Sequence, residues 1–164
     1  RNRIDQLFKK NYASDWLINV PSELMLSQED LRKIEKVILR LRRETNKEPT
    51  HDGIVPNMTF GFWRSFFNKK YDTVIWHRKN SITSVFPNLQ HNHRRRFYIE
   101  HKLLNIKELR NRIAHHEPIW NQRNLVYLGY DACKELIHAI SAEALVMLKA
   151  IDRFSLIEKN LFFE

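Results

Sequence analysis

The chain has 164 residues, of which 43% are hydrophobic, with only 3 glycines and 5 prolines. Its length suits one domain with one core, and the scarcity of turn residues argues against a β-sandwich or a β-barrel. Lys and Arg total 28 against 19 Asp and Glu, and a net charge of +9 suits a polyanionic partner such as RNA. We therefore expect a single all-α domain over residues 1–164.

The composition also bears on localisation. A single cysteine, Cys133, rules out an internal disulfide framework and suits a reducing cytoplasm. Glu143 and Lys149 interrupt the longest apolar run, which falls short of the roughly 20 residues of a membrane span. The first residues do not form a signal peptide. We expect a cytoplasmic protein without membrane contact.

Residues 1–12 are predicted to be the end of a first helix. Ile4, Leu7 and Phe8 have helical spacing from the outset, so we expect natural residues before Arg1 that complete this helix.

Residues 27–47 give the clearest helical pattern. Ser27 is the predicted N-cap and Asp30 follows three residues later, as in a capping box. One face of this helix is apolar, at Leu31, Ile34, Ile38 and Leu41.

A loop over residues 48–57 and a short aromatic helix over residues 59–71 are expected next. Thr59 or Asn57 can cap this helix. Its aromatic side chains are predicted to pack in a core or an interface: Phe60, Phe62, Trp63, Phe66 and Phe67.

The remaining chain is predicted to hold further helices. One or two short ones lie within residues 72–88, and a long basic helix covers residues 91–118. A long apolar helix over residues 130–154 is expected at the centre of the core.

The stretch ELRNRIAHHEPIW, residues 108–120, carries the candidate chemistry. On a helix, Arg110 would point into the apolar stripe that packs against the core, and a buried guanidinium there must be paired or lie at a cleft or interface. That stripe consists of Ile99, Leu103, Ile106, Leu109 and Ile113.

The spacing of the polar residues sets a geometric condition. Asn111 and His115 are four residues apart, so they share a helix face if the helix reaches residue 115. Arg110 and His115 diverge by about 140° on an ideal helix. They can converge only if the helix ends there, which Pro118 favours, or if a second copy of the motif faces the first.

Arg and His at this spacing have the parts for metal-independent RNA cleavage. A histidine can move protons near neutral pH, and an arginine presents a planar fork to a phosphate. The structural alternative is an ordinary helix C-terminus. In that case His115 and His116 interact favourably with the helix dipole, and Arg110 packs against nearby residues.

LRNRIAHHEPI, together with MTFGFWRSFF, Ile75-Trp76 and VFPN, resembles the Abi-like family of bacterial abortive-infection proteins, in the HEPN superfamily. The resemblance covers most of residues 57–120. It implies an all-helical, bundle-like domain with an RNase site of the form Arg, polar residue, then His, commonly at a dimer interface. The matching residues are Arg110, Asn111 and His115, with His116 also at a permitted spacing.

The resemblance further implies a role in phage defence or as a toxin, with RNA as substrate, a homodimer, and an antitoxin or phage component as a further partner. Members of the superfamily without the activity are also known. The alternative function is therefore a catalytically silent RNA-binding or protein-interaction module on the same helical scaffold.

Two further site predictions concern RNA and metal. Arg94, Arg95 and Arg96, beside two histidines and two aromatics, could hold phosphates, or could simply form a solvated helix start. No His and Cys combination has a structural zinc spacing, and no glycine-rich phosphate loop occurs, so neither a metal nor a cofactor is predicted.

Overall fold

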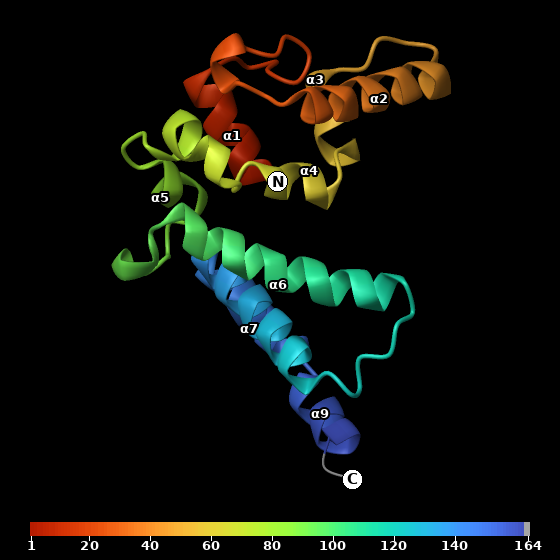
Figure 1. Cartoon of the computed structure of the whole chain (residues 1–164), viewed down its shortest axis with the longest axis vertical. Coiled ribbons are helices and arrows are strands. Elements are labelled where there is room, and N and C mark those ends of the chain that lie inside the picture. Colours follow the sequence, from red (N-terminus) through yellow and green to blue (C-terminus); the bar gives the residue numbers. More distant parts are fainter. Residues whose placement is uncertain (163–164) are drawn as a thin grey trace. The chain divides into compact units, whose positions relative to one another are not determined.

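A computed structural model describes residues 1–162 of the chain, and every regular element within that range is helical (Figure 1). The predicted all-α fold class is confirmed. Contacts cluster into two compact units, one comprising residues 1–85 and the other beginning at Phe86. Each unit is described separately below, and the expectation of one HEPN-type domain stays a prediction.

The first unit contains one long and four shorter α-helices, with 3₁₀ or π turns in three of the four segments between them. Side-chain caps start three of its helices, since Ser27, Thr50 and Thr59 each accept the N–H of the third residue on, all at 3.2 Å. The helices are α1 (Asn2–Asn11), α2 (Gln28–Thr45), α3 (His51–Ile54), α4 (Phe60–Ser65) and α5 (Ser81–Val85).

The observed caps test three of the sequence predictions. The helix capped by Ser27 is confirmed, and Thr59 rather than Asn57 caps the aromatic helix. The predicted loop over residues 48–57 is wrong, because Thr50 starts α3 within it and a 3₁₀ turn follows.

Aromatic side chains form the core of the first unit. The Phe8 ring meets the rings of Trp16 and Phe66 edge to face, with centroids 4.9 and 4.8 Å apart. Phe62 and Phe66 are likewise edge to face at 5.1 Å. The predicted packing role of the aromatic helix is confirmed except at Phe60, which is 40% exposed.

The second unit centres on a pair of long helices, α6 (Arg96–Ala114) and α7 (Arg123–Ile140), which lie side by side (Figure 1). A 3₁₀ turn at His91–His93 precedes α6. After α7 come α8 (Ala142–Ile151) and α9 (Phe154–Phe162).

The long helix predicted over residues 130–154 is wrong in both its start and its continuity. It begins earlier, at Arg123, and ends at Ile140. Asn88 binds its last carbonyls, donating its backbone N–H to Ala139 O at 3.0 Å and its amide Nδ2 to His138 O at 3.1 Å. Ser141 then caps α8. Of the two helices that replace the predicted one, α7 contributes buried side chains and α8 contributes none. The predicted central position in the core is therefore wrong for α8.

Gly129 allows α6 and α7 to approach closely. A methyl group at Gly129 would lie 2.5 Å from Leu109 Cδ2 and 2.9 Å from Leu109 Cβ. The second distance involves an atom fixed by the α6 backbone, so a change of rotamer cannot relieve the clash. The two helices must therefore move apart if a side chain is added.

We expect Gly129→Ala to lower the free energy of unfolding by about 1–3 kcal/mol, because overpacking outweighs the higher helix propensity of alanine. Urea denaturation would measure this. Gly61→Ala is the matched control, since its new methyl group would meet nothing closer than Thr59 Oγ1 at 3.8 Å. A loss of stability no larger at Gly129 than at Gly61 would contradict the close-contact argument.

Candidate functional site

The C-terminus of α6 ends in a Schellman motif formed by the histidine pair. His115 is the C-cap residue, and His116 adopts a left-handed backbone with φ of 55°. His116 N–H donates to Ile113 O at 3.1 Å, and Glu117 N–H donates to Arg112 O at 2.9 Å. These two hydrogen bonds are those that define the motif. They answer why the helix stops before Pro118.

Arg112 reinforces this helix end, a role that the sequence reading missed. Its Nη1 lies 3.1 Å from Glu117 Oε2, so the same two residues are joined through both backbone and side chains. The pair spans five positions, which on a continuous helix would separate the side chains, so only the turn at His116 brings them together.

Arg110 is exposed, and its prediction as a residue of the packing stripe is wrong. The stripe leaves the core toward the end of α6: Ile99 is fully buried, whereas Ile113 is 54% exposed. Arg110 Nη1 donates to Asn111 Oδ1 at 3.1 Å. No ion pair between Arg110 and a carboxylate occurs in the described part of the chain.

His115 stays within the last turn of α6, since its N–H donates to Asn111 O at 2.9 Å. Its side chain is exposed, as is that of His116. Among residues 1–162, the Asn111 amide makes its side-chain hydrogen bond to Arg110 and none to His115. Asn111 thus steadies the guanidinium rather than the imidazole.

This arrangement offers an exposed cation, an amide and two titratable rings at one helix end. In one copy of the chain, no described contact joins Arg110 to either histidine. The helix end therefore presents the groups without assembling them, and an RNA phosphate or a second copy would have to bring them together.

His116 occupies the backbone position where glycine is most favourable. We expect His116→Gly to raise the free energy of unfolding by about 0.5–1 kcal/mol, because a left-handed conformation strains residues with a Cβ. Thermal denaturation of the variant would measure this, with exposed His101→Gly within α6 as a control that should lose about 1 kcal/mol. Destabilisation by His116→Gly would show that the imidazole itself holds the helix end.

The three arginines near the start of α6 have different surroundings. Arg94 is exposed and donates Nε–H to Leu89 O at 3.0 Å, and Arg95 is exposed with its guanidinium 6.0 Å from the Phe97 ring centre. Arg96 is only 9% exposed and forms an ion pair with Glu100. Two of the three predicted RNA contacts therefore face solvent. The helix observed here, α6, begins later and ends earlier than the helix predicted over residues 91–118.

The described residues contain neither a candidate metal-binding cluster nor a helix that could span a membrane. No group of three or more His, Cys, Asp and Glu side chains there could hold a metal ion. None of the helices in that part of the chain has the length and apolar character needed to cross a membrane.

Comparisons with known proteins give no match: no family model fits the chain, and neither a curated protein nor a solved structure is similar to it. The resemblance to the Abi-like family therefore rests on the quoted motifs, and the case for function rests on the chemistry at the end of α6.

Proposed function

We propose that this protein is a metal-independent endoribonuclease that acts as a homodimer in phage defence or as a toxin. The proposal is carried by one observation: Arg110 and His115 are exposed at one helix end beside the half-buried Asn111, and Arg110 is hydrogen-bonded to Asn111 and to no carboxylate of the described chain. An arginine without an acidic partner is available to bind a phosphate. The net charge of +9 favours RNA as the source of that phosphate.

The proposed reaction assigns each group a role. His115 takes the proton from the ribose 2′-hydroxyl, whose oxygen attacks the adjacent phosphorus while the bond to the 5′-oxygen breaks. Arg110, steadied by Asn111, binds the phosphate oxygens as negative charge grows on them. A second histidine gives a proton to the departing 5′-oxygen, leaving a 2′,3′-cyclic phosphate and a 5′-hydroxyl.

A homodimer is proposed to supply that second histidine. Support comes from α8, which has no buried residue and exposes apolar side chains: Val146, Met147 and Ile151 are 68%, 73% and 76% exposed. Apolar surface of this kind favours association. In a two-fold symmetric dimer, the partner subunit would offer its own copy of the motif.

The catalytically silent module remains the second candidate, because Arg110 and His115 make no contact with each other in the described chain. In such a silent module, Arg110 would bind a phosphate of the ligand and His115 would have no catalytic role.

Induced expression in a bacterial host tests the proposal. We expect wild type to slow growth and fragment cellular RNA, His115→Ala to relieve both effects, and His101→Ala, which changes another exposed histidine of α6, to act like wild type. Growth arrest by His115→Ala equal to that by wild type, at equal protein levels, would contradict catalysis by His115 and favour the silent module.

A further inference from the structure

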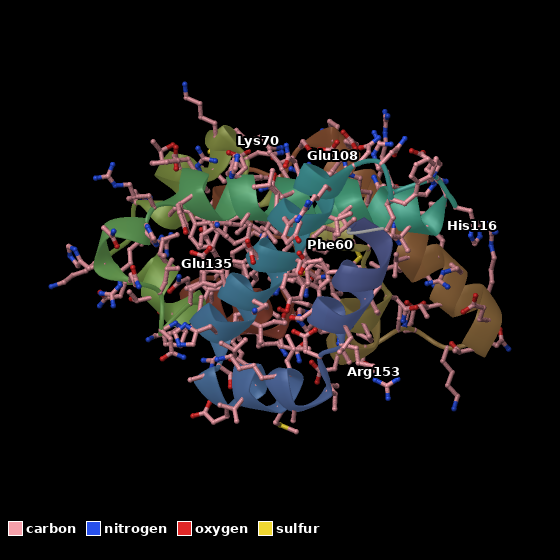
Figure 2. The ribbon with its side chains drawn as sticks, turned by 90° about the horizontal axis from the view of Figure 1, so that it is seen from below. Phe60, Lys70, Glu108, His116, Glu135 and Arg153 are labelled. Atoms are coloured by element: carbon pink, nitrogen blue, oxygen red, sulfur yellow. The ribbon has the colours of Figure 1, made fainter. Side chains whose placement is uncertain are left out.

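A small pocket with polar and apolar walls lies near the start of α6, away from the Arg110 and His115 site. It measures about 170 Å³ and is open to solvent between residues 88–93 and the C-terminal half of α7. Leu89 and Ala139 form apolar walls, and the polar lining residues are Asn88, Gln90, His93, Glu135 and His138. Figure 2 shows Glu135 and His116 far apart within this unit.

The carboxylate of Glu135 is held in a fixed position in this pocket. Its Oε1 accepts a hydrogen bond from the Tyr98 hydroxyl, and Lys102 Nζ lies 2.5 Å from its Oε2. Burial opposes ionisation of Glu135, but the hydrogen bonds from Lys102 and Tyr98 outweigh it and hold the pKa of this carboxyl below its usual range. The pocket therefore presents an anion at neutral pH.

This carboxylate has unused capacity to accept hydrogen bonds. A carboxylate offers about four acceptor positions, and Tyr98 and Lys102 occupy two of them. His93 Nδ1 is 3.8 Å from Oε1, beyond hydrogen-bond distance. About two positions, one on each oxygen, are therefore left for a ligand with two neighbouring N–H donors.

The pocket also has an aromatic component. The His93 ring is stacked on Tyr98, with centroids 4.1 Å apart and planes within 10°. One face of the imidazole is thus covered, and the part that lines the pocket is the opposite face or the ring edge. Single-stranded RNA is commonly read by such rings together with hydrogen bonds to the Watson–Crick edge of a base.

Among the RNA bases, guanine alone has two adjacent donors on that edge, the imino N1–H and the amino N2–H. Adenine and cytosine each offer an amino donor beside an acceptor, and uracil offers one imino donor between two acceptors. We propose that this pocket binds a guanine base of RNA, with the two oxygens of Glu135 accepting its two neighbouring N–H groups. The inference rests on the proposed function for its choice of RNA as ligand.

The residues around the pocket indicate where the bound guanine would lie along the RNA relative to the cleaved bond. Exposed Arg94 and Arg95 lie in the adjoining turn and can bind the flanking phosphates. The 19 residues of α6 separate this turn from His115, a distance of about 28 Å along the helix axis. At about 3.4 Å for each stacked nucleotide, that distance corresponds to about eight nucleotides. The pocket therefore selects RNA by a base remote from the cleaved bond.

Binding of labelled 12-nucleotide 2′-O-methyl RNAs to the wild-type chain tests this, since they lack the 2′-hydroxyl that cleavage needs. The probes are oligouridylates with one central guanine, 7-deazaguanine, adenine or hypoxanthine. We expect guanine and 7-deazaguanine, which keep both donors, to bind about tenfold more tightly than adenine. Hypoxanthine, which lacks the amino group, should lose most of that gain.

Glu135→Gln keeps the size of the side chain, and we expect it to remove the preference for guanine. Glu35→Gln makes the same chemical change at an exposed residue of α2 outside the pocket lining, and should keep discrimination between guanine and hypoxanthine. Equal binding of all four probes by wild type would overturn the guanine pocket, whatever the stability of the variants. Cleavage of the matching unmodified RNAs then reports separately on the proposed function, because that reaction depends on His115.

Discussion

We expect the rate of RNA cleavage to fall about 10²–10⁴-fold when His115 is replaced by alanine, the usual range for losing a positioned general acid or base. His115 is exposed in the last turn of α6, so the replacement should leave folding intact. Single-turnover rates of purified wild type and variant on the same RNA would measure the loss. Thermal denaturation of both proteins would check that the fold is unchanged.

His116→Gly is the sharpest control for this experiment. It removes an adjacent exposed imidazole while satisfying the left-handed backbone at that position. We expect its cleavage rate to stay within a few-fold of wild type. A loss at His116 as large as that at His115 would contradict the assignment of both proton transfers to the His115 side chains of the two subunits.

The second large effect concerns Asp30, a carboxylate 2% exposed in the first unit. Its Oδ2 accepts the Ser27 hydroxyl at 2.6 Å and the buried Tyr71 hydroxyl at 3.3 Å, and Lys33 Nζ lies 3.2 Å from Oδ1. Asp30→Ala should lower the free energy of unfolding by about 3 kcal/mol, because it leaves buried donors without their acceptor. Urea denaturation at pH 7 would measure this.

The pH dependence provides an independent check. Burial opposes ionisation of Asp30, but hydrogen bonds from Ser27 and Lys33 and the charge of Lys70 outweigh it and lower the pKa of Asp30 from 3.8. A folded-state pKa below the unfolded one stabilises the fold above the unfolded value, and this contribution is lost as the pH falls through the folded value.

Asp30→Asn, which keeps the shape but not the charge, is the matched variant. We expect the stability difference between wild type and Asp30→Asn to shrink as the pH is lowered below about 3.8. A difference that stays constant from pH 7 to pH 3 would show that the charge of Asp30 does not contribute.

Local signals allowed the sequence to predict some helices well. The cap at Ser27 and the apolar spacing after it lie within one short segment, so the start of α2 could be predicted from neighbouring residues. The end of α7 could not be, because the group that binds its last carbonyls is Asn88, some 50 residues away in the chain. Thr50 gave a local signal that the surrounding turn residues obscured.

At the candidate site, too, some features could be predicted from neighbouring residues and others could not. The motif from Arg110 to Pro118 and the helix end near it followed from residue spacing. The exposure of Arg110 could not be predicted in the same way. Helical periodicity shows which side chains share a face, but it does not show how far along the helix the core extends. The core ends before Ile113, and this leaves Arg110 exposed. The role of His116 depends on its backbone conformation, for which glycine would have been the usual signal.

Metal-independent RNA cleavage by this protein is best tested by incubating labelled RNA with purified wild-type protein in EDTA and analysing the product ends. We expect cleavage without metal that leaves 2′,3′-cyclic phosphate and 5′-hydroxyl ends, because the 2′-oxygen attacks the phosphorus. Intact RNA after incubation with folded, dimeric protein would contradict it, as would products with a 5′-phosphate.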